Sequence, residues 1–156
     1  MKILFLHGLD AQPGGIKPTY LTQQGHEVMN PALPRDDFDE SLNIARAQWE
    51  QGRPDVIVGS SRGGALALAM DQRVTPMILL APAWRFFLPS IPNPCRADIL
   101  HAPLDALVPI DHSRELALAW PTVVRLFEIG QRHTLTDAES LARMDQSVRE
   151  LVAHSP

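Results

Sequence analysis

Short apolar runs alternate with helix-like segments along this chain, and this alternation most restricts the folds open to it. Uninterrupted apolar runs this short, rich in β-branched residues, are typical of strands buried on both faces. A strand, a helix and a second strand form a right-handed βαβ unit, which places the strands parallel in one sheet. The runs expected as strands are residues 3–6, 26–29, 56–58, 77–80, 99–100 and 123–129.

Helix signals fill the intervals between these runs, as apolar side chains at helical spacing or as strings of strong helix formers. Asp111 is expected to cap one helix, and Thr136 with Glu139 has capping-box spacing at the start of another. The 156 residues are expected to form a single three-layer α/β/α domain, with a mainly parallel sheet covered on both faces. The expected helices are residues 20–24, 38–49, 66–70, 111–120 and 136–152.

Three side chains with complementary chemistry follow predicted strands. Ser61 follows the third apolar run, Asp105 follows the fifth and His133 follows the last. Because the carboxyl ends of parallel strands meet at one edge of the sheet, we expect these side chains to lie together. A serine hydroxyl becomes an effective nucleophile when a histidine takes its proton and a carboxylate orients that histidine. The pattern therefore predicts Ser61 as nucleophile, His133 as base and Asp105 as acid.

The segment from Gly59 to Gly63 has the form Gly-x-Ser-x-Gly, centred on Ser61. At a sharp bend from strand to helix, Cβ atoms two residues to either side of the serine would crowd each other, and glycine removes them. The bend also leaves the serine at a helix N-terminus, where free N–H groups favour developing negative charge.

Several neighbouring residues compete for these roles. Ser60 is an alternative nucleophile, but it lies off the centre of the motif. Asp111 is an alternative acid, although capping already gives it a structural use. Asp98 precedes its predicted strand and is expected at the opposite end of the sheet. Of the other histidines, His101 is expected in the core with its hydrogen bonds satisfied, and His112 on the surface.

The strings LFLHG, VIVGSSRGG, MILLAPA, ILHAPLDALVPIDHSREL and FEIGQRHTL resemble the α/β-hydrolase family along residues 3–151. The resemblance implies a six-stranded sheet of order 2-1-3-4-5-6, and it gives Ser61, Asp105 and His133 the same roles. It also implies an oxyanion hole formed by the backbone N–H groups of Leu9 and Arg62. The chain lacks the family's first antiparallel strands and a cap domain, and it most resembles a short, esterase-like bacterial branch.

Together these features predict a serine hydrolase that cleaves small carboxylic esters or thioesters through an acyl-enzyme, without a cofactor. The alternative is a non-catalytic interaction protein that retains the fold. The aromatic side chains Trp84, Phe86 and Phe87 follow the fourth predicted strand and are candidates for an apolar wall beside the serine. His7 is a further pocket candidate, expected to brace the oxyanion loop by hydrogen bonding.

Composition argues against several other classes of function. A formal net charge of -4 and an isoelectric point near 5.8 do not favour binding to nucleic acid or to an anionic membrane. No stretch approaches the ~20 apolar residues of a membrane span. Cys95 is the single cysteine, so no internal disulfide or cysteine-based zinc site is expected, and a cytoplasmic location fits. The expected partner is a small-molecule substrate, with no metal ion.

Overall fold

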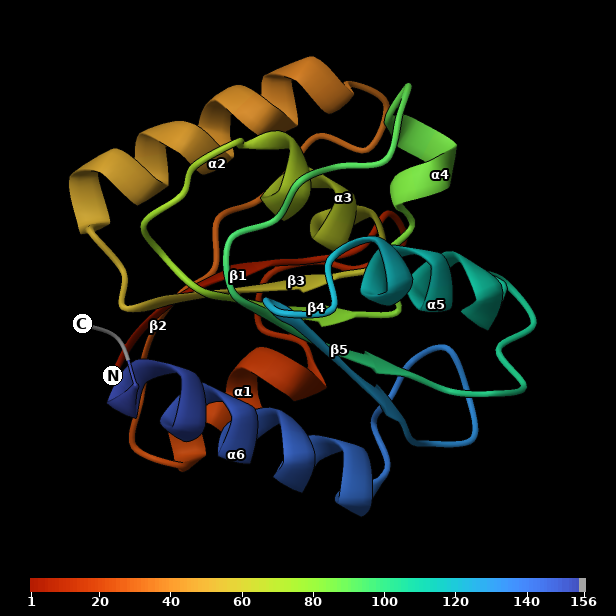
Figure 1. Cartoon of the computed structure of the whole chain (residues 1–156). Coiled ribbons are helices and arrows are strands. Elements are labelled where there is room, and N and C mark those ends of the chain that lie inside the picture. The colour runs from red at the N-terminus through yellow and green to blue at the C-terminus, as the bar shows by residue number, and fades with distance from the viewer. Residues whose placement is uncertain (155–156) are drawn as a thin grey trace.

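A computed structural model describes residues 1–154 and shows one sheet of parallel strands (Figure 1). The strand order is β2-β1-β3-β4-β5-β6, and every neighbouring pair is parallel. This order confirms the sheet that the sequence predicted. The strands are β1 (Lys2–Leu6), β2 (Glu27–Met29), β3 (Val56–Ser60), β4 (Met77–Leu80), β5 (Ala97–His101) and β6 (Val124–Glu128).

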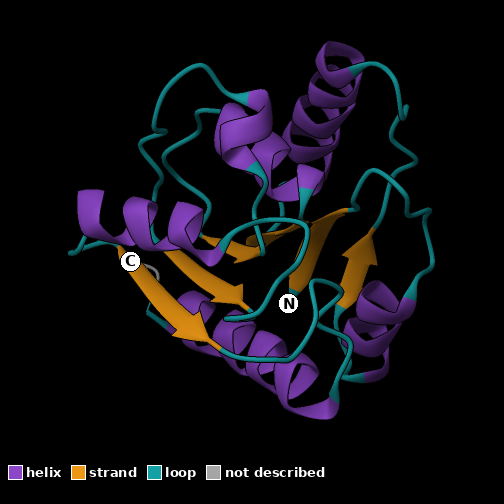
Figure 2. Ribbon diagram, turned by 90° about the vertical axis from the view of Figure 1, so that its right-hand side faces the viewer, coloured by secondary structure: helices purple, strands orange, loops and turns teal. Residues whose placement is uncertain are grey.

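Helices cover both faces of the sheet, which confirms the three-layer architecture (Figures 1 and 2). Within residues 1–154, no helix has both the length and the apolar character needed to cross a bilayer. On one face lie α2 (Phe38–Gly52), α3 (Arg62–Ala69), α4 (Trp84–Phe87) and α5 (Ile110–Ala119). On the other face lie α1 (Ile16–Gln23) and α6 (Ala138–Ala153).

The strands supply two hydrophobic cores because successive side chains of a strand point to opposite faces. In β1, Leu4 and Leu6 pack with α2 and α3, whereas Ile3 and Phe5 pack with α1 and α6. All four side chains are almost fully buried. Burial on both faces explains why the strands appear in the sequence as continuous apolar runs instead of alternating patterns.

Asp98 corrects one expectation, because it lies inside β5 and not before it. The strand register places Asp98 directly opposite Arg125 of β6. The Asp98 carboxylate is fully buried and accepts two hydrogen bonds from the Arg125 guanidinium, of 2.8 and 2.7 Å. A bidentate pair of this kind allows a charged residue to occupy a strand interior, which sequence pattern alone did not indicate.

Two predicted helix caps were wrong. Helix α5 begins after Pro109, so Asp111 is the second helical residue, and its exposed carboxylate pairs with Arg114 at 3.1 Å. Helix α6 is capped by Asp137, whose carboxylate accepts a hydrogen bond from the Ser140 backbone N–H at 3.0 Å. In both cases the helix starts one or two residues away from the predicted cap, because tertiary packing decides which turn is completed.

Helix α3 approaches β1 at Gly63 more closely than any side chain would allow. A Cβ atom on Gly63 would lie 2.0 Å from the carbonyl oxygen of Leu6. The contact is between two backbones, so no side-chain rotation could relieve the clash. The glycine therefore determines how closely the first turn of α3 packs on the sheet.

This close approach predicts that Gly63→Ser destabilises the protein, because overpacking a core contact costs roughly 1–3 kcal/mol or more. Gly15→Ser is the matched control. Gly15 is the N-cap of α1, has an ordinary φ of −66°, and a Cβ there would meet nothing closer than 3.9 Å. Serine is a favoured N-cap, so this variant should unfold in urea at the wild-type midpoint or above it. Equal midpoints for the two variants would contradict the prediction.

Candidate active site

Ser61 lies at a sharp bend between β3 and α3. Its backbone has φ 56° and ψ −113°, a region that residues other than glycine rarely adopt and that costs about 1–3 kcal/mol. The Ser61 backbone N–H donates to the Leu80 carbonyl oxygen of β4 at 2.8 Å, which anchors the bend to the sheet. A Cβ on Gly59 would lie 2.5 Å from the Gly63 carbonyl oxygen, so the crowding expected from the motif is present.

The bend turns Ser61, and not Ser60, toward a histidine on a distant loop. Ser60 is the last residue of β3 and is buried. The Ser61 hydroxyl lies 3.0 Å from Nε2 of His133, in the loop between β6 and α6. Three helices and three strands separate the two residues along the chain, and parallel packing of the strands brings their loops to the same end of the sheet.

His133 is held on its other side by Asp105. The imidazole Nδ1 lies 2.6 Å from Oδ2 of the Asp105 carboxylate. An ionised carboxylate only accepts hydrogen bonds, so the histidine proton resides on Nδ1. Nε2 is then free to accept the proton of the Ser61 hydroxyl. The structure thus brings the three predicted residues into one hydrogen-bonded chain, from acid to imidazole to hydroxyl.

The Asp105 carboxylate is buried and well supplied with donors. Its Oδ1 accepts hydrogen bonds of 2.8 Å from the backbone N–H groups of Leu107 and Val108. Burial raises the pKa of the Asp105 carboxyl, but the hydrogen bonds from Val108, His133 and Leu107 outweigh burial and hold that pKa below its ordinary value. The group is therefore ionised at neutral pH.

A second histidine contacts the same carboxylate. His101 is the last residue of β5, and its Nε2 lies 2.8 Å from the Val108 carbonyl oxygen and 3.3 Å from Oδ2 of Asp105. Its Nδ1 lies 2.7 Å from the Ser113 hydroxyl. Burial lowers the pKa of His101, so the ring is neutral and carries its proton on Nε2, which faces two acceptors.

The contact between His101 and Asp105 was missed in the sequence, although its signal was present. The sequence correctly indicated a buried, hydrogen-bonded His101. A histidine that ends a strand four residues before a candidate acid can reach back to that acid across the intervening turn. The turn itself is closed by a hydrogen bond from the Asp105 N–H to the Ala102 carbonyl oxygen at 3.1 Å.

The side chain of Arg62 serves the fold instead of the cavity. It is almost fully buried, and its guanidinium donates to the Pro34 carbonyl oxygen at 3.0 Å and to the Ser41 hydroxyl at 3.2 Å. The guanidinium also lies over the rings of Phe38 and Phe87, at 5.6 and 5.9 Å from their centroids. Arg62 therefore ties α3 to α2 and α4, a role that the motif did not indicate.

A cavity of about 450 Å³ opens beside Ser61 and His133. Phe86 and Phe87 of α4 line it, as the sequence suggested, together with Leu107 from the loop that carries Asp105. Phe86 and Leu107 are also largely exposed, so apolar side chains surround the mouth of the cavity. Leu9, from the loop after β1, lines it as well.

One predicted pocket residue lies behind this cavity and not in its wall. Trp84 is buried, and its indole N–H donates to the His112 carbonyl oxygen at 3.0 Å, so the ring is used in packing α4 against α5. His112 is half-buried against Phe86, with ring centroids 5.7 Å apart, and not on the surface as predicted.

His7 faces a neighbouring hollow. It braces its own loop by hydrogen bonding, as the sequence predicted. Its Nδ1 donates to the Gly8 carbonyl oxygen at 2.8 Å, and its Nε2 accepts from the Leu33 backbone N–H at 3.1 Å. Both ring nitrogens are therefore occupied. The imidazole holds the loop after β1 in place beside the cavity and does not face Ser61.

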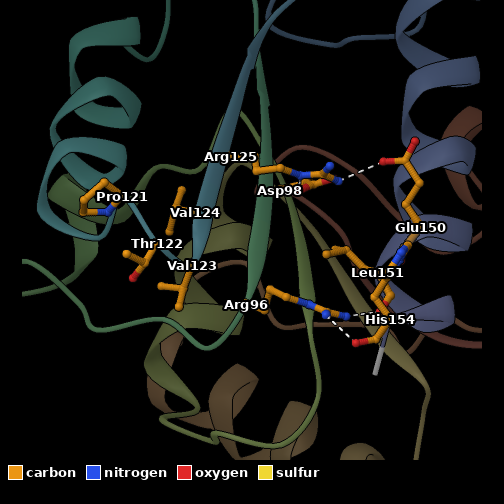
Figure 3. A pocket seen from close by; sticks show the side chains of 10 residues that line it. All are labelled: Arg96, Asp98, Pro121, Thr122, Val123, Val124, Arg125, Glu150, Leu151 and His154. Carbon is orange, nitrogen blue, oxygen red and sulfur yellow. Dashed lines mark hydrogen bonds and ion pairs between the residues drawn. The ribbon is translucent and has the colours of Figure 1, made fainter. Parts of the chain in front are cut away.

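A larger hollow, of about 550 Å³, lies at the opposite end of the sheet, near the start of β5 and β6 (Figure 3). Its charged groups satisfy one another: Arg125 pairs with Asp98 and with Glu150 at 2.9 Å. Arg96 donates to the main-chain carbonyl oxygens of His154, at 2.7 Å, and Leu151. This hollow contains no nucleophile with an adjacent base, so the chemistry points to the cavity at Ser61. Among residues 1–154, no group of three or more His, Cys, Asp or Glu could hold a metal ion.

Comparison with known proteins identifies the fold. No protein-family model and no curated protein sequence matches the chain. Mouse alpha/beta hydrolase domain-containing protein 10 matches with a TM-score of 0.76 and 17% identity, over 97% of this chain and 89% of that chain. The monoacylglycerol lipase of Paleococcus ferrophilus matches with a TM-score of 0.77 and 14% identity, over 99% of this chain and 95% of that chain. Est1E of Butyrivibrio proteoclasticus matches with a TM-score of 0.77 and 14% identity, over 97% of this chain and 88% of that chain. The chain therefore has the α/β-hydrolase fold.

The lowered pKa of Asp105 predicts a specific dependence of stability on pH. Because the folded state favours the ionised carboxylate, Asp105 stabilises the fold above the ordinary aspartate pKa of about 3.9 and loses that contribution as the pH falls through its folded pKa. In urea unfolding, the stability of the wild type relative to Asp105→Asn should be greatest near neutral pH and should shrink below about pH 4. Asp111→Asn is the control, because it removes an exposed carboxylate. A constant difference across this range would contradict the prediction.

Proposed function

We propose that this protein is a serine hydrolase that cleaves carboxylic esters or thioesters of small molecules. The observation that carries the proposal is the hydrogen-bonded chain from Asp105 through His133 to the Ser61 hydroxyl, beside a cavity large enough for a small ligand. The shared fold with lipase and esterase structures supports a hydrolase in general terms. The identity of the reacting groups rests on the geometry of this chain's own residues.

The geometry suits acyl transfer to water in two steps. In the first, the Ser61 oxygen attacks the substrate carbonyl carbon while His133 Nε2 takes the hydroxyl proton. The imidazolium is stabilised by the Asp105 carboxylate, and it returns the proton to the departing alcohol or thiol, which leaves an acyl-enzyme. In the second, His133 takes a proton from water, the hydroxide attacks the acyl carbon, and the proton passes back to the Ser61 oxygen as the acid departs.

We assign stabilisation of the oxyanion of each tetrahedral intermediate to two backbone N–H groups, those of Arg62 and Leu9. Arg62 is the first residue of α3, where a backbone N–H has no carbonyl partner within the helix. Leu9 lies in the loop after β1 that His7 braces, and it lines the cavity with Ser61. Donors of this kind are worth roughly 3 kcal/mol each. The strained bend at Ser61 directs the hydroxyl toward His133.

The cavity favours a substrate with an apolar portion near the scissile bond. Phe86, Phe87 and Leu107 offer apolar surface to an acyl chain or to a leaving group. Within residues 1–154 the helices lie against the sheet, and none forms a separate cap over this site. An open cavity offers few extended subsites, which favours the intrinsically more reactive esters and thioesters over amides. No step of this mechanism calls for a cofactor.

The nucleophile can be tested by covalent labelling. A fluorophosphonate probe should label the wild-type protein, and Ser61→Ala should abolish both labelling and hydrolysis of 4-nitrophenyl acetate, because the attacking oxygen is removed. Ser60→Ala is the matched control, since it changes the neighbouring buried serine, and it should retain most of the activity. Circular dichroism should show that both variants are folded. An unlabelled wild type would instead indicate a non-catalytic interaction protein, and a dead Ser60 variant would transfer the nucleophile to Ser60.

The acid can be tested by comparing two aspartates. Without its carboxylate the histidine can adopt the wrong tautomer, and an isosteric Asn in a comparable arrangement costs about 10⁴ in kcat. We expect Asp105→Asn to lose at least ~10²-fold in kcat, measured at neutral pH with 4-nitrophenyl acetate. Asp111→Asn should retain activity, because the Asp111 carboxylate is 82% exposed and pairs with Arg114. A reversed pattern would assign the acid to Asp111.

A further inference from the structure

The cavity at Ser61 contains a positive charge that the mechanism above does not use. Lys17, in the first turn of α1, lines this cavity and also the adjacent hollow of about 160 Å³ that His7 faces. The chain has two lysines, and the other, Lys2, pairs with Glu27 at 3.7 Å in the amino-terminal half of the sheet. Lys17 thus presents the one lysine ammonium at the site.

The ammonium of Lys17 has donors to spare. It donates one hydrogen bond, of 2.7 Å, to the carbonyl oxygen of Thr134, the residue after His133. An ammonium carries three donors. Among residues 1–154, Lys17 takes part in no ion pair with a carboxylate. A half-buried cation without a counter-charge is a costly feature for a fold to keep, and it suits a site that receives an anion.

The acidic side chains nearest to this region are engaged elsewhere. Asp10, which also lines the cavity, is largely exposed and pairs with Arg35 at the rim. Asp105 is held by His133 and by backbone N–H groups. On α6, which packs beside α1, Asp137 caps its helix through Ser140. A further acid on α6, Asp145, pairs with His26 at 2.6 Å and with Arg149 at 2.9 Å.

The other basic groups around the cavity are equally occupied. The Arg62 guanidinium is turned toward Pro34 and Ser41. Both nitrogens of His7 are hydrogen-bonded within its own loop, and His133 lies between Ser61 and Asp105. Lys17 is therefore the cation best placed to meet an incoming anion.

Burial sets the charge state of this group near the physiological range. Removal of the ammonium from water lowers the pKa of Lys17 to about 8. The side chain is mostly charged at neutral pH, and it becomes neutral as the pH rises above its pKa. Any attraction that it exerts on an anion is present below about pH 8 and is lost above it.

We propose that Lys17 is a specificity residue that binds a carboxylate carried by the substrate. The inference rests on the proposed hydrolase function and narrows its substrate class to esters or thioesters that combine an apolar portion with an anionic group. The apolar part lies against Phe86, Phe87 and Leu107, and the carboxylate accepts the unused N–H donors of Lys17. A charge-assisted hydrogen bond in a partly buried site strengthens binding more than a neutral one would.

Matched pairs of esters test this inference, and they distinguish a carboxylate on the acyl side from one on the alcohol side. The acyl pair is mono-4-nitrophenyl glutarate against 4-nitrophenyl pentanoate. The alcohol pair is 4-acetoxybenzoate against its methyl ester. In at least one pair, the wild type should favour the carboxylate by about tenfold or more in kcat/KM at neutral pH, the scale of a hydrogen bond to a charged group.

Three substitutions separate charge from structural support. Lys17→Gln keeps a donor for the Thr134 carbonyl but removes the charge, and it should reduce the preference for the carboxylate ester by about tenfold. Lys17→Arg keeps the charge and should retain the preference. Lys2→Gln, the matched control at the other lysine, should behave as the wild type. The preference of the wild type should also decline as the pH rises from about 7 to about 9.5, whereas that of Lys17→Arg should not.

Three results would overturn the inference. Hydrolysis of the neutral esters with no preference in either pair would refute Lys17 as an anion site and leave the proposed function standing. An equal loss on both members of a pair in Lys17→Gln would mean that the lysine only supports the loop of His133. Failure to hydrolyse any ester, with Ser61 unlabelled by the fluorophosphonate, would refute the proposed function and this inference together.

Discussion

The backbone contact between Gly63 and Leu6 is the constraint on which the site depends. Helix α3 can begin at Arg62 only because nothing larger than hydrogen separates its first turn from β1. That approach forces the chain through the strained conformation at Ser61, which the hydrogen bond to Leu80 holds in place. The half-buried Ser61 hydroxyl and the first backbone N–H of α3, at Arg62, both follow from the same bend. The strained conformation of Ser61 is thus held by backbone contacts with both strands that neighbour β3, β1 and β4.

The charged groups at the site differ in how many hydrogen-bond and ion-pair partners they have. Asp105 faces two backbone N–H groups and two imidazoles, one of which is neutral His101. These contacts keep the carboxylate ionised while burial opposes ionisation, so His133 meets a full negative charge. Lys17 is the opposite case, a cation with one carbonyl partner and, within residues 1–154, no ion pair with an acid. Asp105 has its hydrogen-bonding capacity filled by the protein, which suits a supporting role. Lys17 has unused donors, which suits the ligand-binding role proposed for it.

At the opposite end of the sheet, the charged side chains pair with one another. Arg125 joins Asp98 of β5 to Glu150 of α6 (Figure 3). Arg143 also contacts Glu150, at 3.0 Å. These ion pairs connect the edge strand β6 to the helix layer behind it. In the larger hollow, the positive and negative side chains of these ion pairs therefore neutralise each other. Cavity size alone would favour this end of the sheet, whereas the hydrogen-bonded chain of Ser61, His133 and Asp105 lies at the other end.

The sequence alone determined the alternation of strands and helices, the layers and the meeting of Ser61, His133 and Asp105, because apolar runs and glycine spacing act locally and parallel strands end at a common edge. The strand order followed from the resemblance to a known family and not from these local patterns. It did not determine the burial of Trp84, the pairing of Asp98 or the capping by Asp137, since each depends on a neighbour that only packing supplies. Nor did it indicate Lys17, an ordinary lysine in a polar segment. Tertiary structure alone decided that this lysine shares a cavity with Ser61, because α1 and the loop after β6 are brought together by packing across more than a hundred residues of chain.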